Sequence, residues 1–349
     1  MKTSDFDYNL PQDLIAQSPA EPRDHSRLLV LDRNTGEIEH RRFYDIVGYL
    51  NQGDVLVFND SRVIPARMYG SLVDTGSKIE LLLLTQNSPT GWKALVKPGR
   101  RMRKGARFLI NGTDDKRAVG TVRDQYPDGS REIEFESKLD FEYFGSLPLP
   151  PYIRETTAPS ERYQTVYAEN EGSIAAPTAG LHFTRELLNR ISEKGVFLEF
   201  VTLHVGWDSF RPLKTEDPSE HKMHSEYWEL TAQVSDRINL AKGEGRRVIS
   251  VGTTAVRLLE NAASNNLSPT LNPGSGWADI FIKPGYEFRV VDSLITNFHL
   301  PKSTLLMLTS ALAGRENILS AYKEAVDNQY RFYSLAMPCL LSKPNERRV

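Results

Sequence analysis

The feature that most constrains the fold is a block of short apolar segments between residues 66 and 147. The block contains KIELLLL, WKALV, ARFLI, AVGTV and REIEFE, and the stretches between them are rich in Gly, Pro, Asn and Asp, which favour turns. Five or more short strands at this spacing predict a small antiparallel barrel or sandwich. The proline-rich stretch LPLPPYIRE (147–155) follows the block and favours an extended linker.

The rest of the chain has a different pattern, in which apolar strand segments are followed by polar loops and helices. Strands that alternate with helices indicate a mainly parallel α/β sheet. The sequence therefore predicts a discontinuous α/β domain of residues 1–65 and 151–349, with an inserted antiparallel β-barrel of residues 66–150. The strand segments that carry this prediction are DVLVF (54–58), VFLEFVTLHV (196–205), RRVISV (246–251) and SLIT (293–296).

Composition limits the class of protein. The 349 residues suffice for about two domains, and 40% hydrophobic with 25% charged residues is ordinary for a globular protein. The single cysteine, Cys339, excludes an internal disulfide and a cysteine-based zinc site. The N-terminus lacks the pattern of a secretory signal, and no apolar run is long enough to cross a bilayer. We therefore expect a cytoplasmic protein with no membrane partner.

Polar loops follow all four strand segments. In open parallel sheets, ligands bind beyond the carboxyl ends of the strands. Turn formation explains each loop singly, but four polar loops at strand ends favour a shared binding site. The candidates in these loops are Asn59, Asp60 and Arg62; His204, Asp208 and Arg211; Thr253, Thr254 and Arg257; and Asn297, His299, Lys302 and Ser303.

Two of these loops precede helices. The backbone N–H groups of Thr253 and Thr254, and those of Lys302 and Ser303, are placed to bind a carboxylate or a phosphate. Ordinary capping of the helices by Thr and Ser explains the same residues without any ligand. Both interpretations remain open at the level of sequence.

The stretch SIAAPTAGLHFT (173–184) gathers small residues around a proline and then presents Thr178 and His182. Small residues allow a backbone and a ligand to approach closely, and a histidine exchanges protons near neutral pH. The alternative is a tightly packed turn whose histidine only bonds to the backbone. We expect Thr178 to contact substrate and His182 to be a catalytic candidate.

The segment EHKMHSE (220–226) contains His221 and His224, with Glu220 and Glu226 beside them. These side chains are of types that bind metals, but no HExxH motif or third spaced ligand accompanies them. No metal is expected, and we favour substrate hydrogen bonding or proton handling for the two histidines.

One loop of the predicted barrel, KPGRRMRKG (97–105), is strongly basic in a chain of net charge −2. A solvated turn is the ordinary interpretation of such a run. In an acidic protein, however, a local basic cluster is also what binding to nucleic-acid phosphates requires. The candidate phosphate contacts are Lys97, Arg100, Arg101, Arg103 and Lys104.

Several long motifs occur in one order along almost the whole chain and together resemble a known family. The chain is similar to the S-adenosylmethionine:tRNA ribosyltransferase-isomerases of queuosine biosynthesis, from FDYNLPQDLIAQ to YRFYS. The motifs are NDSRVIPAR (59–67), ERYQTVYA (161–168), AAPTAGLHFT (175–184), VTLHVG (201–206), MHSE (223–226), SVGTTAVRLLE (250–260) and LITNFHLPKSTLLML (294–308).

The resemblance implies a reaction. The ribosyl group of S-adenosylmethionine would be transferred and isomerised onto the aminomethyl group of 7-aminomethyl-7-deazaguanine at the tRNA wobble position. The product would be epoxyqueuosine-tRNA, with release of adenine and methionine. The partners would be this tRNA and the co-substrate, with no further cofactor, and we expect a monomer. The family architecture, an α/β domain with an inserted barrel, agrees with the strand pattern.

The implied chemistry also suggests roles for residues. A base must remove a ribose proton beside the sulfonium, and a histidine suits this near pH 7. The candidates are His182, His204 and His299, with Asp60 as a rival or an orienting partner. A carboxylate such as that of methionine would suit Arg257 and the amides of the 253–254 turn. The aromatic rings of Phe183, Phe210 and Phe298 would either favour the sulfonium or pack in the core.

Two other classes of function remain alternatives. One is another α/β transferase that uses S-adenosylmethionine or a nucleotide and acts on a small molecule. The other is a noncatalytic RNA-binding module in which the barrel is the binder. Several polar loops at strand ends favour an enzyme over the second alternative, and a basic barrel loop favours a tRNA substrate over the first.

The chain departs from the family pattern at two places. GWDSFRP (206–212) has the bulkier Trp207 and Asp208 where the family has small residues. From Leu335 the chain reads LAMPCLLSKPNERRV in place of the family's aromatic-Gly-Asp-Ala-Met-Leu-Ile ending. Deletion of one base from codons for that ending yields Leu-Ala-Met-Pro-Cys-Leu. We therefore hypothesise a frameshift, and codons at position 335 that are unrelated to that frame would disprove it.

Overall fold

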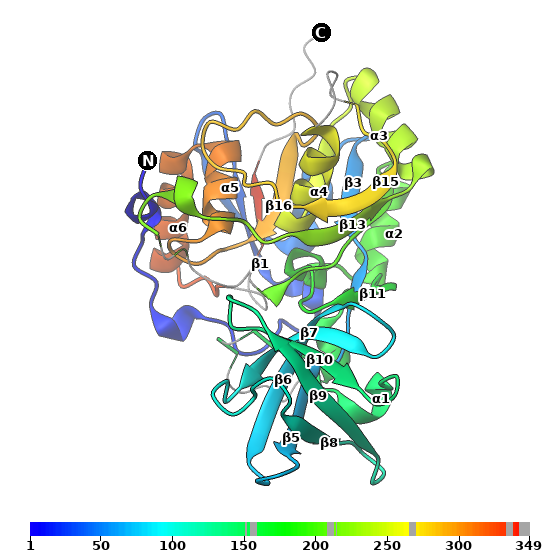
Figure 1. Ribbon diagram of the computed structural model, residues 1–349. Helices are drawn as coiled ribbons and strands as arrows, with labels where there is room; N and C mark the ends of the chain where they lie inside the picture. Colours follow the sequence, from blue (N-terminus) through cyan, green and yellow to red (C-terminus); the bar gives the residue numbers. More distant parts are fainter. Residues whose placement is uncertain are drawn as a thin grey trace. The chain divides into compact units, whose positions relative to one another are not determined.

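The computed structural model describes residues 1–150, 152–153, 159–207, 213, 215–264, 270–332 and 338–341 (Figure 1). The chain divides into two compact units, one of Met1–Arg62 with Pro151–Val349 and one of Val63–Pro150. The first unit is built on a mixed sheet and the second on a closed barrel. The predicted fold class, an α/β domain with an inserted antiparallel barrel, is confirmed.

The sheet of the first unit has nine strands, four of which form a parallel centre. The neighbouring pairs β12–β3, β3–β14 and β14–β16 are parallel, whereas the pairs towards both edges are antiparallel except β17–β1. In spatial order the strands are β15 (Gly274–Ala278), β13 (Glu226–Leu230), β12 (Phe197–Leu203), β3 (Val55–Asn59), β14 (Val248–Val251), β16 (Ser293–Asn297), β17 (Pro338–Leu341), β1 (Arg27–Leu31) and β2 (Ile38–Arg42).

The central strands are continuous apolar runs because helices cover both faces of the sheet. Alternate residues of β3 enter two different cores: Val55 and Val57 enter one, and Leu56 and Phe58 enter the other. The first core is closed by α3 (Ala232–Gly243), α4 (Thr253–Ser264), α5 (Thr304–Ala313) and α6 (Arg315–Asp327), and the second by α2 (Arg185–Glu193) and the 3₁₀ helix η4 (Phe43–Tyr49).

The second unit is a closed barrel in which every neighbouring pair of strands is antiparallel. Closure leaves no free sheet edge, so short strands suffice for a stable domain. In spatial order the strands are β10 (Arg131–Phe135), β7 (Gly91–Lys97), β6 (Lys78–Gln86), β5 (Arg67–Leu72), β8 (Arg107–Asn111) and β9 (Arg117–Gln125), and the short helix α1 (Phe141–Phe144) follows them.

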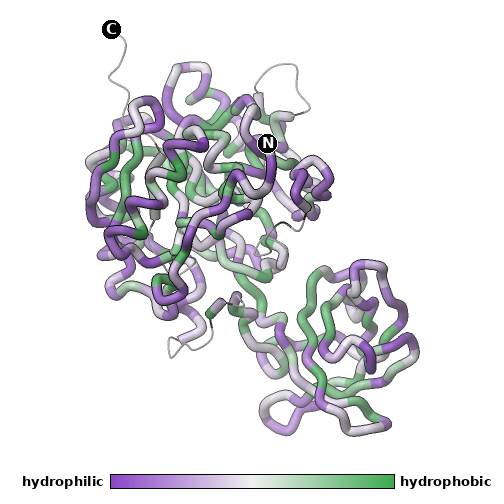
Figure 2. The backbone as a smooth tube through the Cα atoms, turned by 90° about the vertical axis from the view of Figure 1, so that its left-hand side faces the viewer, coloured by the Kyte–Doolittle hydropathy of each residue, from purple (hydrophilic) through white to green (hydrophobic). Residues whose placement is uncertain are grey.

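Hydropathy follows this architecture, since hydrophobic stretches lie along the strands and hydrophilic stretches at the turns (Figure 2). A short two-stranded sheet pairs β4 (Ser61–Val63) with β11 (Asn170–Ser173). Within the described residues, no helix combines the length and apolarity needed to cross a bilayer.

Candidate functional site

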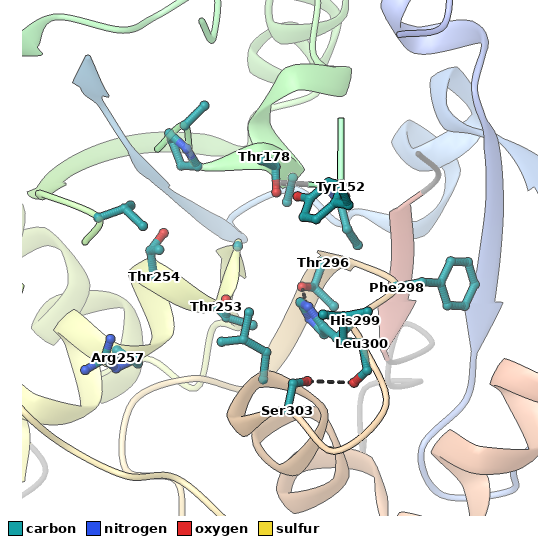
Figure 3. Close-up of a pocket in the computed structure, with 17 residues that line it drawn as sticks. Tyr152, Thr178, Thr253, Thr254, Arg257, Thr296, Phe298, His299, Leu300 and Ser303 are labelled. Atoms are coloured by element: carbon teal, nitrogen blue, oxygen red, sulfur yellow. Dashed lines mark hydrogen bonds between the residues drawn. The ribbon is translucent and has the colours of Figure 1, made fainter. Parts of the chain in front are cut away.

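A pocket lies where the parallel strands β14 and β16 end, at the edge of the sheet that the strand-end rule indicates (Figure 3). One wall comes from the start of α4 and another from the loop between β16 and α5. A third wall is the small-residue segment before the 3₁₀ helix η6 (Thr178–His182). Among its lining residues are eight that the sequence nominated: Thr178, Thr253, Thr254, Arg257, Asn297, Phe298, His299 and Ser303.

The sharp turn at Gly252 creates the α4 wall. Gly252 has φ of +92°, a conformation that favours glycine, and its N–H donates to the carbonyl of Ile295 at 2.8 Å. Helix α4 can therefore begin at Thr253, directly beside the end of β16. Helix α5, which follows the other wall, has an ordinary N-cap: the Ser303 hydroxyl accepts a hydrogen bond from the N–H of Leu306 at 3.2 Å.

His299 is the one catalytic candidate among the residues that line the pocket in the described part of the chain. Its Nε2 lies 3.0 Å from the hydroxyl of Thr296, and its backbone N–H donates to the hydroxyl of Tyr322 at 3.0 Å. Burial lowers the pKa of His299 to about 3. The ring is therefore neutral at physiological pH and can accept a proton.

His182 is buried at the end of η6 and packs on Phe43, with ring centroids 5.4 Å apart. Its Nδ1 lies 3.0 Å from the hydroxyl of Ser26, and its Nε2 has no hydrogen-bond partner within the described residues. Burial lowers the pKa of His182 to about 3, and the nearby carboxamide of Asn297 opposes this shift. His182 thus supports the pocket from behind Asn297 and does not line it.

Asp60 and His204 form a second group, which the pocket lining does not include. Asp60 accepts a hydrogen bond of 2.7 Å from the hydroxyl of Thr202, and burial raises the pKa of its carboxyl group. The ring of His204 stacks on that of Tyr227. Burial lowers the pKa of His204, whereas the negative charges of Glu229 and Asp60 raise it by a smaller amount. The two titratable candidates are therefore electrostatically coupled to each other.

Arg257 lies in the pocket wall with a counter-ion of the protein's own. It forms a buried ion pair with Glu226 and donates to the carbonyl of Ala278 at 3.1 Å. Burial alone would raise the pKa of the Glu226 carboxyl group. The positive charge of Arg257 and the contact with His224 outweigh burial and hold this pKa at about 2. Nε of Arg257 has no hydrogen-bond partner in the described part of the chain. Most of this guanidinium is therefore committed to the protein, and its Nε–H is left without a partner.

The remaining polar candidates have structural contacts of their own. The carboxamide of Asn59 cross-links β3 to β12: it donates to the carbonyl of Leu203 at 2.9 Å and accepts from its N–H at 3.0 Å. Each of the others contacts a neighbour away from the pocket lining: Arg62 pairs with Glu161, Lys302 pairs with Asp7, His221 packs on Phe281, and His224 lies 3.3 Å from Glu226. Arg211, Asp208 and Phe210 lie outside the described residues.

The two described aromatic candidates for sulfonium contact are core residues. Phe183 packs against Phe43 and Phe58, and Phe298 packs against Tyr322 and Phe332. In Figure 3 the ring of Phe298 points away from the pocket. Core packing, the second of the two interpretations, accounts for both rings.

Sequence reasoning missed the role of Glu226, which it considered only as a neighbour of two histidines. Its function as the counter-ion of Arg257 depends on β13 and α4 meeting in space, and no spacing in the chain shows this. Within the described residues, no group of three His, Cys, Asp or Glu side chains is placed to hold a metal ion.

The two buried histidines predict a pH dependence of stability. The free energy of unfolding should fall as the pH decreases from about 6.5 towards 3, because the unfolded chain binds protons that folded His182 and His299 exclude. Urea unfolding of the wild type and of His299→Gln at about pH 7 and about pH 5 checks this, because the carboxyl groups that titrate in this range are common to both proteins. The wild type should lose more stability, and equal losses would contradict the assignment.

The fold is an α/β unit, discontinuous in the chain, that carries an inserted β-barrel, and its pocket lies where α/β enzymes bind their ligands. The chain belongs to the queuosine biosynthesis protein family, whose family model matches residues 3–339.

Individual relatives agree with this assignment. A protein of Clostridioides difficile (strain 630) named S-adenosylmethionine:tRNA ribosyltransferase-isomerase is 54% identical, over 96% of this chain and 98% of its own length. A protein of the same name from Desulforamulus reducens is 53% identical, over 98% of this chain and 100% of its own length. The fold also resembles the crystal structure of S-adenosylmethionine tRNA ribosyltransferase from Thermotoga maritima, with a TM-score of 0.55. The two sequences are 37% identical, and the match covers 97% of this chain and 100% of the Thermotoga chain.

Proposed function

We propose that this protein is an S-adenosylmethionine:tRNA ribosyltransferase-isomerase. It transfers and isomerises the ribosyl group of S-adenosylmethionine onto the aminomethyl group of 7-aminomethyl-7-deazaguanine in tRNA, and it releases adenine and methionine. The observation that carries this proposal is identity of more than half of the residues, over nearly the full length, to proteins of that name. The polar pocket at the strand ends supports it, since this is where α/β enzymes bind ligands.

His299 is the residue that we assign to proton removal from the ribose carbon beside the sulfonium. It lines the pocket, and burial keeps its ring in the neutral form that accepts a proton. Because its pKa is far below neutrality, it is a weak base, and the sulfonium must supply the acidity of the carbon. Loss of adenine, attack by the tRNA amine and closure of the epoxide with loss of methionine then follow.

One experiment tests the reaction and this assignment together. The protein is incubated with S-adenosylmethionine and tRNA carrying 7-aminomethyl-7-deazaguanine, and the digested nucleosides are analysed by mass spectrometry. We expect epoxyqueuosine when the wild-type protein acts on the modified tRNA. We expect no epoxyqueuosine from His299→Gln, and none from the wild type with tRNA that lacks 7-aminomethyl-7-deazaguanine. Wild-type protein that forms no epoxyqueuosine would contradict the function, whereas an active His299→Gln would contradict only the choice of base.

The barrel loop of residues 97–105 is our candidate for tRNA phosphate contact. All five of its cations, Lys97, Arg100, Arg101, Arg103 and Lys104, are exposed. Beneath them the buried Arg131 donates to the carbonyls of Gly99 at 2.9 Å and Met102 at 2.6 Å, which holds the loop backbone in place. Within the described residues, the only carboxylate that pairs with these cations is Asp124, at 3.6 Å from Lys104. The exposed cations of this loop can therefore contact the phosphates of a polyanion.

Replacing Arg100, Arg101 and Arg103 by glutamine should weaken tRNA binding and flatten its salt dependence. Each phosphate contact contributes about 0.7–0.9 to the slope of log K against log salt, so the loss of three contacts should reduce the slope by about two to three. Arg107→Gln with Arg123→Gln is the matched control, because these exposed barrel arginines already pair with Glu136 and Glu134. Filter binding from low to high salt measures both slopes, and equal slopes would remove the loop from the interface.

A further inference from the structure

The carboxamide of Asn297 is buried in the pocket wall without a partner. Asn297 ends β16, is one of the residues that line the pocket, and is only 4% exposed. Neither Oδ1 nor Nδ2 has a hydrogen-bond partner in the described part of the chain. Asn59, which ends the parallel strand β3, is the contrast, because its carboxamide is fully bonded to backbone and to Thr254.

An unsatisfied carboxamide is costly in the free protein. Each buried polar atom without a partner costs about 1–3 kcal/mol, so such a group calls for an ordered water, an ion or a ligand that completes it. A carboxamide presents an acceptor and a donor side by side in one plane. Its complement is a planar group that offers a donor beside an acceptor, as the amino-substituted edge of a purine does.

The rest of the pocket narrows the class of ligand. Within the described residues no carboxylate lines it, so it offers no counter-ion to the ammonium group of an amino acid. Alanine, proline, leucine and tyrosine side chains supply apolar walls, and Thr178, Thr253, Thr254 and Thr296 supply hydroxyls. Apolar walls with few directed polar groups suit a neutral heteroaromatic base with an attached ribose.

His182 gives Asn297 a fixed orientation. The imidazole lies close enough to the Asn297 carboxamide to have its pKa raised by it, and its own Nε2 is unpartnered. A neutral ring anchored at Nδ1 by Ser26 can bond one end of the carboxamide and leave the other end for the pocket. His182 is thus a positioning residue for Asn297.

We propose that this pocket is the base-binding subsite and that Asn297 determines its specificity by reading the amino-substituted edge of a purine-type base. The inference rests on the proposed function, under which two such bases meet the enzyme: the adenine of S-adenosylmethionine and the deazaguanine of tRNA. Both present a ring nitrogen beside an exocyclic group, and binding measurements separate them.

The test compares wild type, Asn297→Ala and Asn34→Ala by calorimetry. The probes are S-adenosylmethionine, its deaminated analogue with a 6-oxo group, and tRNA carrying 7-aminomethyl-7-deazaguanine. If the base is adenine, Asn297→Ala loses about 10- to 100-fold in affinity for S-adenosylmethionine, together with the preference over the analogue. If the base is deazaguanine, the same loss appears only for tRNA. Asn34, an exposed asparagine, should show neither loss.

Stability separates a ligand-reading role from a structural one. Asn297→Ala removes only the contact with the His182 ring, so its urea midpoint should stay close to that of the wild type. Asn59→Ala, which breaks bonds, should be clearly destabilised. Unchanged affinity for both probes, or an unfolding loss like that of Asn59→Ala, would overturn the inference. Calorimetry needs no turnover, so inactive wild type that binds its ligands would contradict the proposed function alone.

Discussion

Replacement of Arg257 by methionine should lower the free energy of unfolding by about 3–5 kcal/mol at neutral pH. Glu226 is fully buried, and Arg257 is its ion-pair partner (side chains 0% and 5% exposed). Removing the cation leaves a buried carboxylate whose remaining contacts, the N–H of Gly206 at 2.9 Å and the ring of His224 at 3.3 Å, do not replace the ion pair. Urea unfolding followed by circular dichroism measures the loss.

The pH dependence of this loss identifies its cause. In the wild type, Arg257 keeps the pKa of Glu226 at about 2, so the stabilisation from the ion pair is present above the ordinary glutamate pKa of about 4.5 and declines below it. Without Arg257, burial raises the pKa of Glu226, and protonation relieves the isolated charge. The deficit should therefore shrink from about pH 7 to about pH 5. A deficit independent of pH would point to lost packing.

A double replacement is the matched control for the ion pair. Arg257→Met with Glu226→Met removes both charges and should recover most of the lost stability, because apolar side chains often replace a buried pair without loss. Adenine release should remain impaired in the double variant if Arg257 also serves the substrate. Full recovery of activity would restrict Arg257 to a structural role.

Replacement of Gly180 by alanine should destabilise η6, the 3₁₀ helix whose first residues line the pocket. A Cβ at this position would lie 1.9 Å from the hydroxyl oxygen of Tyr167 and 2.9 Å from Cγ2 of Thr165. Overpacking of this kind costs about 1–3 kcal/mol. It would also displace η6 and the segment before it, so affinity for S-adenosylmethionine should fall together with stability.

Two further variants make the Gly180 test specific. Gly243→Ala, at the end of α3 with nothing within 4 Å of the new Cβ, should be neutral or stabilising. Tyr167→Phe should cost little, because the buried hydroxyl has no partner within the described residues, and it should partly rescue Gly180→Ala. If the free energy of unfolding of Gly180→Ala equalled that of Gly243→Ala, the residues around Gly180 would have accommodated the methyl group, and the prediction would be wrong.

The small residues of SIAAPTAGLHFT therefore have a physical reason that the sequence indicated only in part. Ala176, Pro177, Thr178 and Ala179 line the pocket, as a close-approach segment should. The requirement for glycine at 180, however, comes from Tyr167, a residue of a separate motif. Only coordinates can show that the two segments pack at this distance.

Local pattern by itself determined the architecture and the edge of the sheet at which to look. Period-two alternation with turn residues predicts barrel strands, and continuous apolar runs before helices predict a parallel sheet, because both patterns depend only on neighbours in the chain. The tertiary structure alone decided which polar residues share the pocket, which are satisfied and which await a ligand. Burial, pKa and hydrogen-bond partners depend on segments hundreds of residues apart. This is why Asn59 and Asn297, alike in sequence context at the ends of parallel strands, have opposite roles.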